Sequence, residues 1–180
     1  MAYRARPPVA MAHPAQWLAV LRIVIGLYFA KAVLTKMTIV LVGGVLPVPA
    51  VQDRWMSVMP TIVAKQAAGN PLALYKHFLE ETVLTHSDLF AHLTAWGEVI
   101  TGVGLTLGLL TGVASLVGLL LVINYGLATQ WMSPGQQGFH LVLVALMIVF
   151  LFARPGRPWG LDAWLATNKP KSPLARRPFS

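Results

Sequence analysis

Residues 96–131, WGEVITGVGLTLGLLTGVASLVGLLLVINYGLATQW, decide the fold class, because they contain two apolar segments and only one charged residue, Glu98. A membrane-spanning helix needs about 20 mainly apolar residues. The segments at about 89–110 and 113–131 have that length and are separated by a short turn near Thr111. This stretch therefore predicts two consecutive membrane helices.

Small residues recur at four-residue spacing along the same stretch. They are Gly104, Gly108 and Gly112, followed by Ala114 and Gly118. In lipid, such positions let two helix backbones approach closely, so we expect the two helices to pack tightly. A glycine phosphate-binding loop is strongly disfavoured, because no strand precedes these residues and the phosphate would lie in hydrocarbon.

The composition of the whole chain is typical of a membrane protein. Of its 180 residues, 56% are hydrophobic and 11% are charged, against about 25% charged in soluble proteins. The mean hydropathy of +0.65 excludes a disordered chain and disfavours a soluble domain. The absence of cysteine excludes disulfides, thiolate metal sites and a cysteine nucleophile.

Two further apolar segments predict an all-α membrane four-helix bundle. One runs from about residue 17 to 45, and the other covers 139–152, or 136–153 at its full length. The expected organisation is a tail, a four-span membrane domain with a long outside loop, and a second tail. These parts cover residues 1–16, residues 17–153 with the loop at about 46–88, and residues 154–180.

The distribution of charge predicts the topology of this bundle. The two tails carry eight basic residues against one acid, whereas residues 43–88 carry three basic residues against four acids. Cytoplasmic segments are enriched in Lys and Arg, so we expect both tails in the cytoplasm. Arg22, Arg154 and Arg157 are expected to contact lipid headgroups. Because the basic residues flank apolar spans, the pattern excludes a nucleic-acid partner.

A secretory signal peptide is the alternative interpretation of the N-terminal segment. Arg4 and Arg6 precede an apolar run from Leu18, and Ala30-Lys31-Ala32 resembles a cleavage site. The apolar run continues to Val45, which favours a retained span.

The outside loop is too long to lack secondary structure. Asn70-Pro71 is a typical helix start, with asparagine at the cap and proline at the first helical position. Apolar residues then recur at helical spacing as far as Val83, which predicts an amphipathic helix lying on the membrane or on the bundle. Residues 51–67 form a weaker helix candidate, because Pro60 lies inside it.

Charged side chains inside membrane spans are costly and are candidates for function. Glu98 lies about 15 Å below the outer surface, at 1.5 Å per residue from the start of its helix. If the first helix ends near residues 42–45, Lys36 lies at a depth of about 9–13 Å and Lys31 at about 17–21 Å. We expect one of these two lysines to pair with Glu98.

Four polar residues share the outer half of the predicted bundle, namely Lys36, Glu98, Asn124 and His140. Two interpretations fit them. They form either a pocket for a ligand or a proton, or an ion pair with hydrogen bonds that only fixes helix packing. Glu98, Lys36 and Lys31 are the candidate proton-transfer or ion-pair groups.

The histidines give little support for a metal or haem site. His140 alone could ligate haem or chlorophyll, but a lone membrane histidine is more often hydrogen-bonded to a neighbour. His77, His86 and His92 are spaced nine and six residues apart, which does not match a compact helical metal site. The serines lack a nucleophile-elbow motif. We therefore predict no metal and assign no catalytic residue.

Five segments resemble the DoxX-type family of membrane proteins. They are WLAVLR (17–22), KAVLTK (31–36), NPLALYKHFLEE (70–81), WGEVITGVGLTLGLLTGVAS (96–115) and FARPGRPWGLDAWL (152–165). The family is similar to the small membrane subunit of thiosulfate:quinone oxidoreductase. This resemblance implies a four-helix bundle, a link to quinone, and a place in the bacterial cytoplasmic (inner) membrane.

Three functional hypotheses follow. The first is a non-catalytic accessory subunit of a larger respiratory or photosynthetic complex, with other subunits and membrane lipid as partners. The second is a quinone-linked oxidoreductase subunit, in which Glu98 handles the quinol proton while Lys36 and His140 contact the quinone head. A small transporter is third, disfavoured by the lack of an inverted repeat. We expect no catalysis by the chain alone, because it has no cysteine to carry a sulfur adduct.

Overall fold

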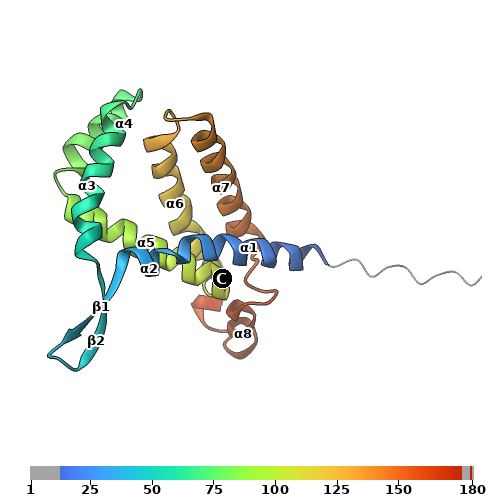
Figure 1. The fold of residues 1–180 in the computed structure, drawn as a ribbon. Helices are drawn as coiled ribbons and strands as arrows, with labels where there is room; N and C mark the ends of the chain where they lie inside the picture. The colour runs from blue at the N-terminus through green and yellow to red at the C-terminus, as the bar shows by residue number, and fades with distance from the viewer. Residues whose placement is uncertain (1–12, 176–178, 180) are drawn as a thin grey trace, which may run out of the picture.

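The computed structural model describes residues 13–175 and residue 179, and these residues are mostly helical (Figure 1). The helices are α1 (Pro14–Ala30), α2 (Ala32–Lys36), α3 (Asp53–Ala68), α4 (Ala73–His77), α5 (Ser87–Leu107), α6 (Thr111–Thr129), α7 (Pro134–Ala153) and α8 (Leu161–Asn168). The other elements are strands β1 (Met37–Val42) and β2 (Leu46–Val51), a π-helical segment (Phe78–Val83) and a 3-10 turn (Pro173–Ala175). The predicted tails lie partly outside this description, which omits residues 1–12 with Arg4 and Arg6, 176–178 and 180.

Three helical stretches of the described chain are long and apolar enough to cross a membrane. They are Pro14–Lys36, Thr111–Thr129 and Pro134–Ala153. The sequence predicts four spans, and α5, which occupies the position of the second, is not among these three. α5 is nonetheless the longest of the helices described above, with 21 residues.

The long helices form one packed unit. α1 packs against α5, α5 against α6, and α6 against α7. A single buried apolar cluster joins all four helices through Phe29, Leu105, Val122, Met147 and Phe150. α3 packs against α5, and α4 packs against α3 and α6. The β1–β2 hairpin projects away from the helices (Figure 1).

Two glycines bring α1 and α5 into close contact. A Cβ at Gly102 would overlap the backbone of Ala30, and a Cβ at Gly26 would overlap the backbone of Thr106. The two contacts are one helical turn apart on each helix and run antiparallel, so they fix the register between the helices. One further turn along α5 from Gly102 lies Glu98, which this register places near the end of α2.

The predicted end of the first span is wrong. The helix stops at Lys36 rather than near residue 45, and an antiparallel hairpin follows it. Segment 37–42, MTIVLV, is rich in β-branched residues, which prefer strands. Gly43 and Gly44 have φ of 63° and 75°, which suits the tight turn of a hairpin. Residues 37–51 carry no charge, and for that reason the hairpin resembles the continuation of a span.

The prolines of β2 lie on one edge of this hairpin. The Gln52 N–H donates to the Lys36 carbonyl at 2.9 Å, so the paired backbone groups of β2 recur at every second residue from Gln52. Pro47 and Pro49 are five and three residues from Gln52 and therefore occupy outward-facing positions. Their missing N–H groups leave the pairing with β1 intact.

Of the two helices predicted in the outside loop, the one at residues 51–67 is confirmed and the other begins later than predicted. The weaker candidate is a continuous 16-residue helix, α3, that includes Pro60. Its buried face packs on the segment that follows α4, which offsets the backbone hydrogen bond lost at the proline. The predicted helix start at Asn70 is displaced to Ala73, because Asn70 Oδ1 accepts from the Leu72 N–H at 3.0 Å and holds a turn there.

The closing segment, predicted as a tail, folds back onto the turn between α5 and α6. Asp162 of α8 is fully buried. Its carboxylate accepts hydrogen bonds from Leu110 N (2.7 Å), Thr111 N (3.1 Å) and Thr111 Oγ1 (2.6 Å). It thereby caps the N-terminus of α6, where the unpaired N–H groups and the helix dipole favour a negative charge.

The prediction that Arg22 reaches the lipid headgroups is wrong, because its side chain is fully buried. Its Nη2 donates to the Trp159 carbonyl at 3.1 Å, and the Asp162 carboxylate is the opposite charge that acts on it. The guanidinium lies where Cβ atoms on Gly108 and Gly160 would otherwise sit. The folded closing segment therefore covers Arg22 and ties α1 to the α5–α6 turn.

We predict that Asp162→Ala lowers the free energy of unfolding by about 3–5 kcal/mol, because it leaves Arg22 buried without its opposite charge. Thermal unfolding of the purified protein in mild detergent measures the loss. Asp88→Ala is the matched control, since Asp88 is an exposed acid in the first turn of α5. Equal Tm values for the two variants would show that the buried carboxylate contributes little to stability.

Candidate functional site

An ion pair between α2 and α5 is the centre of the site. Lys36 Nζ lies 2.7 Å from Glu98 Oε2, and the two side chains are 14% and 12% exposed. Lys36 is the last residue of α2, and Glu98 lies one turn from the Gly102 contact described above. Opposite charges withdrawn from water attract strongly, whereas either charge left alone there costs several kcal/mol.

Two aromatic side chains complete this pair. Tyr125 Oη donates to Glu98 Oε1 at 2.8 Å, so each carboxylate oxygen has a partner. The Lys36 ammonium also lies 3.9 Å from the centroid of the Trp55 ring, a favourable cation–π arrangement. Trp55 is held in place because its Nε1 donates to the Ala91 carbonyl at 3.1 Å.

A polar pocket of about 270 Å³ lies beside the ion pair. Its wall includes Lys36, Glu98, Tyr125 and His140 together with the rings of Tyr28, Phe29 and Phe139. His140 is buried, and its Nδ1 lies 2.8 Å from the Gln136 carbonyl. Because a carbonyl can only accept, Nδ1 carries a proton in this contact.

The structure brings together three of the four residues predicted to share a pocket, namely Lys36, Glu98 and His140. Asn124 lies apart from them, so its placement in that pocket is wrong. Its carbonyl and Oδ1 accept from Tyr75 Oη at 2.9 and 3.2 Å. Successive residues of a helix point about 100° apart, and Tyr125 takes the position that the prediction gives to Asn124.

Tyr125 is the residue that sequence reasoning missed. It lies six residues before Trp131, which places it about 9 Å from that end of its span. A phenol inside an apolar segment needs a hydrogen-bond partner. Glu98 at a similar depth is the available acceptor, so the signal was present in the sequence.

The other predicted side chains lie outside this network. Lys31 is exposed, with its Nζ 4.1 Å from the centroid of the Tyr28 ring, and it lines the polar pocket without pairing with Glu98. Arg154 is half-buried and Arg157 is exposed. The contact of these two arginines with lipid headgroups stays a prediction.

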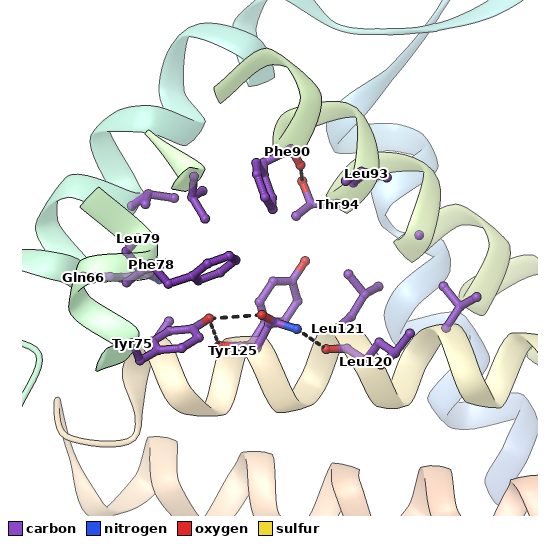
Figure 2. A pocket seen from close by; sticks show the side chains of 16 residues that line it. Gln66, Tyr75, Phe78, Leu79, Phe90, Leu93, Thr94, Leu120, Leu121 and Tyr125 are labelled. Atoms are coloured by element: carbon purple, nitrogen blue, oxygen red, sulfur yellow. Dashed lines mark hydrogen bonds between the residues drawn. The ribbon is translucent and has the colours of Figure 1, made fainter. Parts of the chain in front are cut away.

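Tyr125 also lines a second pocket, of about 310 Å³ and mainly apolar (Figure 2). α3, α4 and the π-helical segment form one wall of it, and α5 and α6 form the other. Burial raises the pKa of the Tyr75 phenol to about 12. The phenol therefore stays protonated at physiological pH and keeps its hydrogen bond to Asn124.

Within residues 13–175 and 179, no group of three or more His, Asp or Glu side chains could hold a metal ion. His86 and His92 each place Nδ1 near a carbonyl one turn earlier in the chain, at 3.0 and 2.8 Å. The chemistry that the polar pocket offers is therefore hydrogen bonding and proton exchange through Glu98, Tyr125 and His140.

Comparison with known proteins gives one match. The family model described as "TQO small subunit DoxD" matches residues 17–175, a range that contains both pockets and the closing segment with Asp162. The match confirms the resemblance to the DoxX type. Neither the curated proteins nor the solved structures include a significant match to this chain.

We expect Lys36→Met and Glu98→Gln each to destabilise the protein, and the double variant to lose less than the sum of both. Each single substitution leaves one charged side chain without its partner, whereas the double variant has neither charge. Chemical unfolding in detergent should give a coupling energy between about 0.5 and 3 kcal/mol.

Lys76 and Glu80 provide the control pair for this cycle. They lie 3.8 Å apart, and their side chains are 39% and 43% exposed. Their coupling should stay at or below about 0.5 kcal/mol. A coupling energy of the same size in both pairs would contradict the prediction that the largely buried Lys36–Glu98 pair is coupled more strongly than an exposed pair.

Proposed function

Since the chain belongs to the family of the TQO small subunit DoxD, we propose that it is a membrane subunit of a larger electron-transfer complex whose polar pocket binds a quinone head group. The observation that carries this proposal is the Lys36–Glu98–Tyr125 network beside His140 in an aromatic-walled pocket. The complex would be of the thiosulfate:quinone oxidoreductase type.

The donor and acceptor groups of the pocket suit a quinone. A quinone is a flat ring with two carbonyl oxygens, and its reduction takes up two electrons and two protons. Phe29 and Phe139 supply flat apolar walls, while the Lys36 ammonium, which has three N–H groups, supplies a hydrogen-bond donor. Glu98 contacts both Lys36 and Tyr125 and is therefore the group placed to hold or pass a proton.

The electrons would come from another subunit. The chain has no cysteine, so a sulfur-bound intermediate would have to form elsewhere in the complex. In this proposal the chain's own residues bind the ring, exclude water and manage protons.

The proposal includes a membrane domain of four helices, in which α5 spans the membrane together with the three apolar helical stretches described above. The exposed apolar residues of α5 are spaced three and four apart on one face; they are Leu89, Leu93, Trp96, Ile100, Val103 and Leu107. This stripe is about 27 Å long at 1.5 Å per residue, close to the thickness of the hydrocarbon core. α5 also packs between α1 and α6, two helices that are themselves apolar enough to span.

With four spans, both ends of the chain lie on one side. The basic charge of residues 1–16 and 154–180 favours the cytoplasm for that side, in the bacterial inner membrane. The Arg22–Asp162 cluster then lies near the cytoplasmic face. The Lys36–Glu98 pair and the hairpin lie toward the outside.

A non-catalytic accessory role is the second candidate, and one observation favours it. Both carboxylate oxygens of Glu98 already have protein partners, Lys36 and Tyr125. Such a closed network can stabilise a subunit without any ligand. Removal of the Glu98 charge distinguishes the two candidates. It lowers quinone affinity if the pocket binds quinone, and it lowers only the stability if the role is accessory.

The test is quinone binding by the complex purified in mild detergent from native membranes. We expect Glu98→Gln to weaken binding of a short-chain quinone by about 10–100-fold, the value of one or two charge-assisted hydrogen bonds. Glu80→Gln is the control, because Glu80 is exposed, pairs with Lys76 and does not line the polar pocket.

Two results would favour the accessory role instead. One is a purified complex that contains no quinone and binds none. The other is a Glu98→Gln variant that lowers Tm while quinone affinity stays equal to that of Glu80→Gln.

A further inference from the structure

The apolar pocket on the other side of Tyr125 has no part in the proposed quinone site. Val63, Tyr75, Phe78 and Leu79 contribute to one wall, and Phe90, Leu93, Val117, Leu120 and Tyr125 contribute to the facing wall. Figure 2 shows the rings of Tyr75 and Phe78 on one side of the space and that of Phe90 on another. The cavity measures about 310 Å³, the lower end of the range for ligand sites.

The hydroxyl groups on both walls are already engaged, and Gln66 and Asn124 supply the other polar side chains of the lining. Thr94 Oγ1 donates to the Phe90 carbonyl at 2.9 Å, Tyr75 Oη donates to Asn124, and Tyr125 Oη donates to Glu98. A polar ligand would find few free partners there and would lose its own hydration. The pocket therefore selects an apolar occupant.

The pocket opens onto the apolar outer surface of α5 and α6. Leu93 and Leu120 are its most exposed apolar lining residues, at 54% and 57%. Leu93 belongs to the exposed stripe of α5, and Leu120 lies on α6 one turn beyond Leu116, which is exposed as well. An occupant can thus pass sideways between hydrocarbon and pocket without crossing water.

The π-helical segment Phe78–Val83 shapes the wall that faces α5 and α6. Its wider turn is marked by the Leu84 N–H, which donates to the Leu79 carbonyl five residues earlier at 3.0 Å. Three of its residues, Phe78, Leu79 and Val83, line the pocket. π-helical turns are rare and are frequent at functional sites, which supports a function for the pocket that this segment lines.

We propose that this pocket binds one acyl chain of a membrane phospholipid, which enters from the bilayer between Leu93 and Leu120. The apolar wall, the engaged hydroxyl groups and the continuity with the lipid-facing stripe support this assignment. The bound chain fills the space between the α3–α4 layer and the membrane helices. It thereby fixes that layer against α5 and α6. This proposal does not depend on quinone binding.

The test uses a phospholipid whose acyl chain carries a photoactivatable diazirine, in phosphatidylcholine vesicles that contain the full-length protein. Within residues 75–83 we expect labelling of Leu79 and Val83, which line the pocket and are only 4% and 5% exposed. Val117→Phe fills the cavity and should reduce this labelling by about tenfold. Leu116→Phe is the matched control on the neighbouring, lipid-facing position and should leave labelling unchanged.

A second pair of variants guards against misfolding of Val117→Phe. Leu93→Trp narrows the opening at an exposed position and should reduce the same labelling. Ile100→Trp changes an exposed residue of the same stripe away from the pocket and should not. Labelling of 75–83 that is equal in all four variants, or absent from the unmodified protein, would overturn the proposal.

Competition identifies the source of the chain. The labelling of 75–83 should fall in proportion as unlabelled phosphatidylcholine replaces the photoactivatable lipid, and a quinone without an isoprenoid tail should leave it unchanged. Loss of the labelling on addition of a long-tailed quinone, where the same amount of added phosphatidylcholine has no effect, would assign the pocket to the isoprenoid tail and overturn the acyl-chain assignment. A failure of quinone binding at Glu98 would leave the expected labelling unaffected.

Discussion

The close approach of α1 and α5 is the constraint on which the rest of the structure depends. Gly26 against Thr106 and Gly102 against Ala30 leave no room for a side chain at either crossing point, and together they fix one antiparallel register. The same register carries Lys36 toward Glu98 at one end of the pair. At the other end it carries Arg22 toward the α5–α6 turn and Asp162. Both buried charge clusters are thus consequences of one backbone contact.

The two charge clusters have different surroundings. Arg22 and Asp162 are fully buried and are held by backbone groups of the α5–α6 turn and the closing segment. Their role is to connect α1, this turn and the closing segment. Lys36 and Glu98 keep a small exposed fraction and border a pocket that His140 also lines. A protein that only needed to neutralise buried charge would not require that space, and for this reason the proposed quinone site is at the Lys36–Glu98 pair.

Much of this arrangement could be predicted from the sequence, and the failures have physical reasons. Apolar length gives the long helices. Depth along a helix leaves both Lys31 and Lys36 as partners for Glu98, because it is counted from a helix end that the structure moves back to Lys36. Depth says nothing about the direction of a side chain around its helix, so Asn124 was placed in the pocket that Tyr125 lines. Hydropathy does not distinguish an apolar strand from an apolar helix, so residues 37–42 were assigned to the first span. The burial of Asp162 depends on contacts between segments some 50 residues apart, which no local pattern reveals.

The hairpin's two edges differ in what they offer to another strand. On the outer edge of β2, Pro47 and Pro49 present carbonyl groups but no N–H groups, so a neighbouring strand would find acceptors without donors. The outer edge of β1 retains both kinds of group at Ile39 and Leu41, whereas the Met37 carbonyl accepts from Gln52 Nε2. A sheet built on this hairpin can therefore grow in one direction only. Even when two copies pair through β1, the assembly ends at a proline edge on each side, and indefinite stacking of this exposed apolar hairpin into fibres is blocked.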